Sequence, residues 1–265
     1  MRQFTLALAI FVLALTPRAR AEEWSKTFTL TGKPSLRVQT SDANIHVEVW
    51  DQNKIQAHIT TEGYSIGEKG IRITDHQTGD SVELEVRYPH HNLNFEIGYH
   101  HRRVDVEIQM PKEGRVELHT GDGHIRLSGL KGEMEIVSGD GHQDIESVDG
   151  TLRAHAGDGH IRASGRFDGL DLSTGDGRIE ATALSGSALA RSWTIHTGDG
   201  GVTLQLPENV SADVDLHTGD GHITVGVPIS VSGRMEGKNI RGKINGGGNL
   251  LSIHTGDGSI RLEKS

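Results

Sequence analysis

One short motif, Gly-Asp-Gly, recurs seven times in this chain of 265 residues and constrains the fold more than any other feature. The first four copies follow one another at intervals of 18 residues, and the long gap before the last copy contains a degenerate one, Gly237-Lys238-Asn239-Ile240. A fixed period of this length predicts a repeat architecture, in which each unit is stable only when it packs against its neighbours. The seven aspartates are Asp122, Asp140, Asp158, Asp176, Asp199, Asp220 and Asp257.

Apolar and polar residues alternate on both sides of each motif. In the first regular unit, Leu118 and Ile125 are expected to point inward, whereas His119 and His124 are expected to point outward. A second glycine follows about ten residues after most of the aspartates, as Gly132 does. The predicted fold is all-β, a β-helix-like β-solenoid of stacked coils of about 18 residues with Gly-Asp-Gly corners. A meander of hairpins or a β-sandwich is the alternative.

Glycine suits the corners because they need either a positive φ or a close backbone approach. One unit departs from the pattern, since Gln143 stands where an isoleucine is expected after Asp140 and Ile145 follows late, so we expect a bulge there. The order of the copies also places Leu262 on an open terminal coil, with the charged residues 263–265 protecting the edge. The residues just before the corners form an inward hydroxyl column, expected to satisfy the corner backbone: Thr120, Ser138, Thr174, Thr197, Thr218 and Thr255.

We divide the chain into a signal peptide (1–21), an N-terminal β region that starts or caps the solenoid (22–110) and the regular repeat (111–265). The first segment has the basic start Arg2, an apolar run from Phe4 to Leu15, and Ala19-Arg20-Ala21 as a small-x-small cleavage site. The apolar run is too short to span a membrane as a helix. We therefore expect cleavage near Ala21 and export to the periplasm, the cell envelope or the medium. The N-terminal region contains a worn copy of the unit at Asp42.

The composition excludes several classes of partner and bond. The chain has no cysteine, which rules out disulfides and a lipid anchor on cysteine. Its net charge is -9, and it becomes -12 when the three arginines of residues 1–21 are removed, with histidines counted as neutral. This acidity, together with the lack of a lysine or arginine cluster, argues against nucleic acid and anionic lipid as partners.

Three stretches together resemble a known family. They are the repeated Thr-Gly-Asp-Gly-x-Ile, the entry from Val104 to Pro111, and the ending that runs from Ile244 through Gly246-Gly247-Gly248 to Ile260. The chain resembles, over roughly Ser35 to Leu262, the putative-adhesin β-strand-repeat family of exported bacterial proteins, a domain-of-unknown-function family. The resemblance implies a β-solenoid-like fold at the cell envelope with no described catalytic site.

Stacking should align like residues into ladders about 4.8 Å apart. We expect the carboxylates of Asp122, Asp140, Asp158 and Asp176 to accept backbone N–H groups inside their own turns. A Ca²⁺ ion shared between coils is the alternative. A further metal candidate is the loop with the pairs His90-His91 and His100-His101.

Histidines form two outward columns, which we interpret as polar positions that tolerate histidine, with Zn²⁺ or Cu²⁺ binding or a pH-responsive face as the alternatives. One column is His124, His142 and His160, followed by Arg178, and the other is His119, His155, His196, His217 and His254.

No catalytic constellation stands out, because Ser, His and Asp recur in every unit. We therefore predict no enzyme, no catalytic, cofactor-binding or metal-binding residue, and no cofactor. The predicted function is that of an exported, adhesin-like β-repeat protein whose polar faces bind an unknown protein or glycan. The first alternative is a metal-binding (Ca or Zn) envelope protein. The second is a β-helix enzyme that acts on polysaccharide, which would need clustered aromatic residues, and Trp24, Trp50, Trp193, Tyr64, Tyr88 and Tyr99 are not clustered in the sequence.

Overall fold

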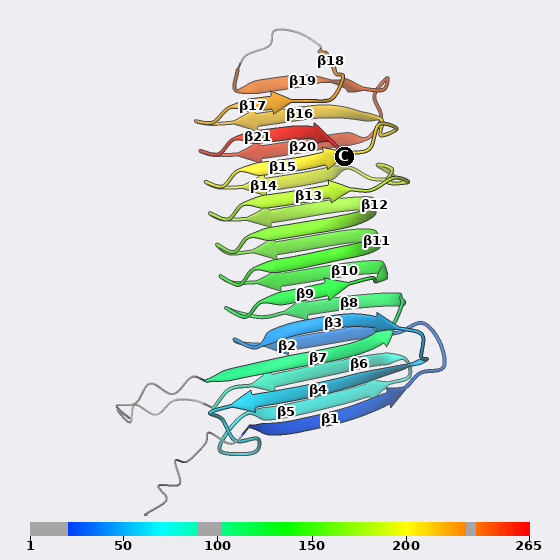
Figure 1. Ribbon diagram of the computed structural model, residues 1–265, viewed down its shortest axis with the longest axis vertical. Coiled ribbons are helices and arrows are strands. Elements are labelled where there is room, and N and C mark those ends of the chain that lie inside the picture. Colours follow the sequence, from blue (N-terminus) through cyan, green and yellow to red (C-terminus); the bar gives the residue numbers. More distant parts are fainter. Residues whose placement is uncertain (1–20, 90–101, 232–236) are drawn as a thin grey trace, which may run out of the picture.

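A computed structural model describes residues 21–89, 102–231 and 237–265. Within these ranges the chain forms 21 strands, all connected through backbone pairing, and no helix (Figure 1). None of the described residues belongs to a helix able to cross a membrane. The all-β, solenoid-like class expected from the repeat is confirmed. The predicted signal segment 1–20 and the loop with the histidine pairs His90-His91 and His100-His101 lie outside the described residues.

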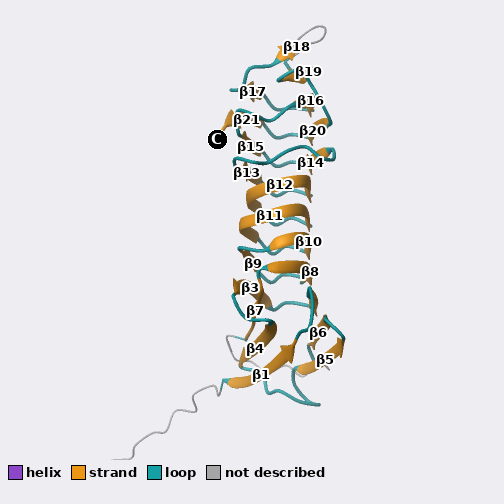
Figure 2. Cartoon of the chain, turned by 90° about the vertical axis from the view of Figure 1, so that its right-hand side faces the viewer, coloured by secondary structure: helices purple, strands orange, loops and turns teal. Residues whose placement is uncertain are grey.

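The regular part is a stack with two faces, seen edge-on in Figure 2. Each coil contributes one strand to each face, and all these strands run parallel to their neighbours in the adjacent coils. The β8 face contains β8 (Glu113–His119), β10 (Lys131–Ser138), β14 (Trp193–Thr197) and the second halves of β11 (Gln143–Ala156) and β12 (Ile161–Thr174). The β9 face contains β9 (Ile125–Ser128), the first halves of β11 and β12, β13 (Ile179–Ala183) and β15 (Val202–Leu206).

The register aligns residues 18 positions apart. Ile136 pairs with Leu118 on one side and with Ala154 on the other, and all three side chains are buried. Because side chains alternate along a strand, the inward residues of both faces meet in one continuous apolar core, and the outward ones form rows on the surface. Each buried Ile or Leu stabilises the stack by roughly 1.5–3 kcal/mol relative to exposure.

The worn copy at Asp42 forms the coil next to the first regular one. Its strands β2 (Ser35–Thr40) and β3 (Asn44–Trp50) pair in parallel with β8 and β9, so that Val38 lies beside Leu118. Below this coil in Figure 1, β6 (Ser81–Arg87) and β7 (Arg103–Pro111) extend the two faces by pairing in parallel with β2 and β3. Three antiparallel strands then end the faces: β5 (Arg72–Thr78) pairs with β6, β4 (Lys54–Glu62) pairs with β7, and β1 (Glu22–Thr29) pairs with β4.

The order of the last coils differs from the order of the sequence. The final coil, β20 (Leu250–Thr255) and β21 (Ile260–Lys264), lies between the coil of β14 and β15 and that of β16 (Ala212–Thr218) and β17 (Ile223–Val225). Leu262 is therefore 0% exposed, and the prediction that it lies on an open terminal coil is wrong.

The degenerate copy is not a coil either. It leads into β19 (Asn239–Ile244), which pairs antiparallel with β16, and β18 (Ser230–Val231) pairs antiparallel with β19. Asn239 occupies the place of the second glycine of the motif, and in the structure it pairs with His217 of β16.

The second glycine of each motif is required by contact between coils. A Cβ added at Gly177 would lie 2.0 Å from the carbonyl oxygen of Gly159, and one at Gly200 would lie 1.8 Å from that of Gly177. None of the corner glycines in these motifs has a positive φ, whereas Gly132 and Gly150 at the opposite corner have φ of 144° and 132°. The Gly-Asp-Gly corners thus need glycine for close approach alone, whereas Gly132 and Gly150 need it for both reasons, since a Cβ there would also lie 1.9 Å and 2.2 Å from a carbonyl oxygen of the adjacent coil.

The inward hydroxyl column lies beside these glycines. Thr197 is buried, its Oγ1 donates to the carbonyl oxygen of Gly177 at 2.9 Å, and it accepts the N–H of Gly200 at 3.2 Å. The predicted role in satisfying the corner backbone is confirmed. The same kind of inward hydroxyl-to-carbonyl bond is made by Thr120, Ser138, Thr174, Thr218 and Thr255.

The bulge expected around Gln143 and Ile145 lies directly after Ile145, and Gln143 itself is not displaced. Gln143 pairs in register with Ile125 and Ile161, and its amide keeps it buried by donating to Ser138 Oγ at 2.8 Å and to the carbonyl oxygen of His155 at 2.7 Å.

The irregularity lies further along β11. Its pairing with β12 shifts between Ile145 and Val148, where Ser147 has a φ of 56°, and shifts again after Gly150. The second shift leaves Asp168 as the extra residue of β12, and hydrogen bonds from Arg166 lower the pKa of its carboxyl.

The corner contact predicts a position-specific effect of a single methyl group. Gly200→Ala should lower the free energy of unfolding by about 1–3 kcal/mol, because the added Cβ would overlap a backbone oxygen that cannot move without shifting a coil. The matched control is Gly201→Ala, whose Cβ would lie 3.4 Å from the carbonyl oxygen of Ser259, an ordinary van der Waals contact, and which should change stability by less than about 0.5 kcal/mol. Urea unfolding of residues 22–265 measures both, and equal losses would contradict this account.

Gln143 predicts a stabilising substitution. Its Oε1 is buried without a hydrogen-bond partner, and its neighbours in register are isoleucines. Gln143→Ile should therefore raise the free energy of unfolding by about 1–2 kcal/mol, because an unsatisfied buried acceptor is replaced by an apolar side chain. Gln143→Ala is the control and should lower it, since it removes the same amide but leaves a cavity. A loss of stability in Gln143→Ile would show that the two hydrogen bonds donated by the amide stabilise the fold by more than the unpaired Oε1 destabilises it.

Candidate functional site: a histidine and arginine face

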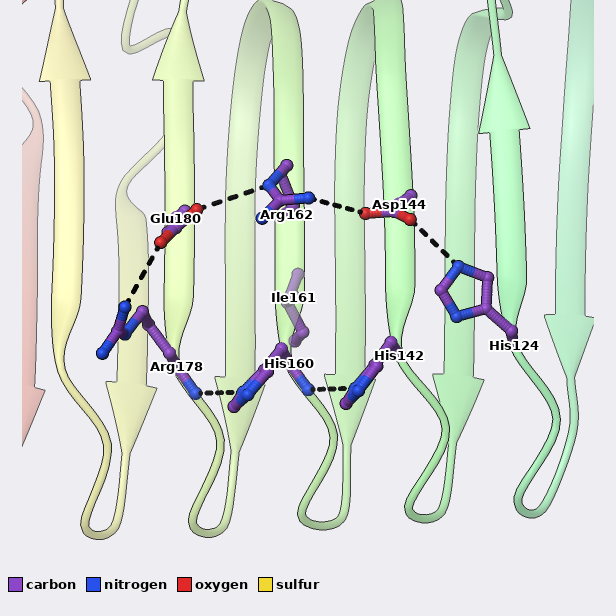
Figure 3. A pocket seen from close by; sticks show the side chains of 8 residues that line it. All are labelled: His124, His142, Asp144, His160, Ile161, Arg162, Arg178 and Glu180. Carbon is purple, nitrogen blue, oxygen red and sulfur yellow. Dashed lines mark hydrogen bonds and ion pairs between the residues drawn. The ribbon is translucent and has the colours of Figure 1, made fainter.

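The residues that follow four consecutive corners lie side by side on the β9 face. His124, His142, His160 and Arg178 occupy the same position in successive coils, immediately before the inward isoleucine or glutamine (Figure 3). Two residues further on, Arg126, Asp144, Arg162 and Glu180 form a second outward row. We call these eight residues the histidine–arginine face. All but Arg126 line one hollow of about 200 Å³.

Asp144 is the centre of the ion pairs on this face. Its carboxylate lies 2.9 Å from His124 Nε2, 3.5 Å from Arg162 Nη1 and 3.9 Å from Arg126 Nη2, so it contacts cationic or polar groups of both adjacent coils. Asp144 is only 19% exposed, whereas Arg162 is 64% exposed. Pairs of this kind contribute at most about 1 kcal/mol to stability. Their main effect is to hold Asp144 in one position.

Glu180 continues the same row. It lies 3.3 Å from Arg162 Nε and 3.8 Å from Arg178 Nη1, and Arg162 therefore bridges the two carboxylates (Figure 3). The three arginines and two carboxylates of the histidine–arginine face give it a net charge of +1 when the imidazoles are neutral. The face is thus locally cationic on an acidic chain.

The imidazoles of this face have a structural role that the sequence did not indicate. His142 Nδ1 accepts the backbone N–H of His160 at 3.1 Å, and His160 Nδ1 accepts the backbone N–H of Arg178 at 2.9 Å. In the worn copy, the Oδ1 atom of Asn44 likewise accepts the N–H of His124. The rings of His142 and His160 are stacked, with centroids 4.9 Å apart and planes 4° from parallel. In all three cases, the side chain that follows the corner accepts the backbone N–H of the residue at the same position in the adjacent coil.

This arrangement bears on metal binding. A neutral imidazole has one N–H and one lone pair, so rings that accept at Nδ1 carry their proton on Nε2 and offer no second lone pair to a metal. Within the described ranges, no group of three or more histidine, aspartate or glutamate side chains is placed to hold a metal ion.

The corner aspartates differ from the expectation that they accept N–H groups of their own turns. In the part of the chain that the structure describes, Asp122, Asp140, Asp158 and Asp176 are exposed at the corner and no such bond is found. The corner N–H groups instead donate to carbonyl oxygens of the adjacent coil. For example, the N–H of Gly157 donates to the carbonyl oxygen of Gly139 at 2.7 Å. The backbone ladder continues through the corner and satisfies it.

The second histidine column is rearranged by the insertion of the final coil. His254 pairs with His196 on one side and His217 on the other, so three histidines that are distant in the sequence are neighbours on the β8 face. His217 is also bonded to Asn239, with 2.7 Å between Nδ1 and Oδ1. Lower in the stack, His155 Nδ1 lies 2.9 Å from Ser173 Oγ.

Two tyrosines that are separate in the sequence meet near the first corner. The rings of Tyr64 and Tyr88 are 5.5 Å apart and perpendicular, and Arg102 lies over the Tyr64 ring at 5.3 Å. Burial, and then the negative charge of Asp42, raise the pKa of Tyr88. The interpretation that the aromatic residues are unclustered therefore fails at this pair, whose two members are distant in the sequence and are brought together only by the fold.

The fold and the rows of polar side chains define the protein as a stacked parallel β-repeat protein. The model of the Toastrack DUF4097 family matches residues 100–263, more than half of the chain. The chain belongs to this family, which confirms the resemblance described above.

Several solved structures are similar at low identity. A "putative cell adhesion protein" of Clostridium sporogenes is 15% identical with a TM-score of 0.45, over 93% of this chain and 100% of that chain. A "putative adhesin" of Bacteroides fragilis is 12% identical with a TM-score of 0.45 and the same coverage. A "putative lipid binding protein" of Parabacteroides distasonis is 14% identical with a TM-score of 0.46, over 91% of this chain and 97% of that chain. A search of curated proteins found no significant relative.

The histidine geometry predicts a tautomer that NMR can measure. At a pH where the imidazoles are neutral, the Nδ1 atoms of His142 and His160 should be unprotonated and the Nε2 atoms protonated, because Nδ1 accepts a backbone N–H in both rings. Long-range ¹H–¹⁵N correlation spectra of the imidazole rings distinguish the two tautomers, and the exposed His222, for which no ring contact is described, is the control. A proton on Nδ1 of either ring would contradict these bonds.

Proposed function

We propose that this chain is an exported, non-catalytic binding protein of the cell envelope, adhesin-like in that it presents polar faces to a protein or glycan on a surface. One observation carries the proposal: the parallel register aligns outward side chains of successive coils into continuous rows over a buried core. Rows of this kind build an extended contact surface, and the hollow at the histidine–arginine face lies on such a surface.

The start of the fold is consistent with export. Strand β1 begins at Glu22, the first residue after the predicted cleavage site, and the Glu22 carboxylate accepts the backbone N–H of Ile66 at 2.7 Å. Cleavage after Ala21 would leave this strand and its bond intact. The names of the adhesin neighbours agree with a surface role for those proteins.

Binding to isolated cell envelopes tests the proposal. Purified residues 22–265 should cosediment saturably with envelopes of the source cells, and the double variant Arg162→Glu/Arg178→Glu should lose most of this binding through charge reversal on the histidine–arginine face. The matched control is Arg153→Glu/Arg191→Glu, which makes the same change of charge in a hollow that also contains Arg115. It should bind like the unchanged protein.

Two results would overturn the proposal. Absence of saturable binding would remove the surface role, and release of new reducing ends from envelope glycans by the purified protein would replace it with the polysaccharide-cleaving alternative. The expected result is binding with no cleavage products.

A further inference from the structure

We propose that the histidine–arginine face binds an acidic polysaccharide, whose anionic groups lie over the outward N–H groups of His142, His160 and Arg178. This inference rests on the proposed function and names the class of partner.

The face presents fixed hydrogen-bond donors. Since the Nδ1 atoms of His142 and His160 accept backbone N–H groups, their Nε2–H groups are left as donors, and ring stacking holds them at a separation set by the strands. Arg178 is 65% exposed and contacts its acidic partner only at 3.8 Å, so most of its five N–H donors are available. Carboxylate and sulfate oxygens are the ligands that such donors bind best.

Acceptors lie within the same hollow. The carboxylates of Asp144 and Glu180 line it beside the arginines, and each carboxylate oxygen has lone pairs beyond those used in the ion pairs. A simple anion has no hydrogen-bond donor for these carboxylates, whereas the hydroxyl groups of a sugar can donate to them. The mixture of donors and acceptors therefore fits a polyhydroxylated anionic chain.

The shape extends the site along the stack. A second hollow of about 500 Å³ shares His124 with the first, and its charged lining residues are Arg103, Arg126, Asp105 and Glu107. Together they form a track that crosses the strands from β7 to β13. An extended polymer can follow this track. A peptide would instead be expected to add to a sheet by its backbone, but these strands are paired on both sides.

The surrounding charge limits the strength of binding. The corner carboxylates of Asp122, Asp140, Asp158 and Asp176 each lie two residues before a member of the row His124, His142, His160 and Arg178, and the whole chain carries a charge of -9. The electrostatic attraction of an anionic polymer is therefore confined to the histidine–arginine face. A stable complex needs the polymer to contact several coils at once. Such binding should weaken steeply as salt is added.

Three polymers of defined charge test the proposal with purified residues 22–265. Polygalacturonate supplies carboxylates, dextran sulfate supplies sulfates, and dextran supplies the same backbone as dextran sulfate without charge. Saturable binding to either charged polymer and none to dextran is the expected result, and the polymer bound more tightly tells which anionic group is preferred.

Matched variants locate the site. Arg126→Gln/Arg178→Gln should weaken binding by about tenfold, while Arg153→Gln/Arg191→Gln, with the same loss of charge outside the histidine–arginine face, should leave it within about twofold. His142→Asn/His160→Asn keeps an acceptor for the backbone, as Asn44 Oδ1 does in the worn copy, but removes the outward Nε2–H donors, so it should melt like the unchanged protein and still lose about tenfold in binding. His142→Ala/His160→Ala removes both groups and should lose about tenfold. Thermal melts confirm that each variant is folded.

Two results would overturn the inference. No binding to either charged polymer would exclude the ligand class, and an equal loss in the two arginine pairs would show charge attraction without a site. If envelopes still bind through the histidine–arginine face in either case, the proposed function stands and only the ligand class is wrong.

Discussion

The contact between a corner glycine and the carbonyl oxygen of the adjacent coil is the constraint on which the rest of the structure depends. At Gly177 and Gly200 there is no room for a Cβ, because the neighbouring backbone lies within about 2 Å of where it would be. This close approach lets the backbone ladder run through the corner, with N–H groups of one coil bonded to carbonyl groups of the next. The buried hydroxyl of Thr197 completes the same contact from inside.

A ladder that continues through the corner also sets the register of both faces. Residues at equal positions in successive coils must lie side by side, and the outward rows of the histidine–arginine face follow from this alone. A histidine at the position after the corner then links two coils, because its Nδ1 accepts a backbone N–H of the adjacent coil. The same bond orients the opposite ring nitrogen outward as a donor. Stability and the binding surface thus arise from one geometric arrangement.

The two ends of the stack are closed by strands of opposite direction. At the N-terminal end β1, β4 and β5 are antiparallel to the strands they cover, and at the other end β19 covers β16 in the same way. The ion pair between Lys26 and Asp75 and the bond from Gln77 to the carbonyl oxygen of Thr29 link the two faces at the first end. Antiparallel, charged end strands of this kind discourage pairing with other chains.

The sequence by itself determined the all-β repeat, the alternation that buries Leu118 and Ile125, the hydroxyl column and the presence of a worn coil at Asp42, because all of these are local patterns. It also identified both histidine columns. Only the tertiary structure decided which coils are neighbours: the final coil lies between two earlier ones, and Leu262 is buried as a result. A genuine Gly-Asp-Gly copy fits between any two others, so local pattern carries no information about stacking order. The tyrosine pair, the role of imidazole Nδ1 and the in-register Gln143 depend on contacts across coils, which no single strand encodes.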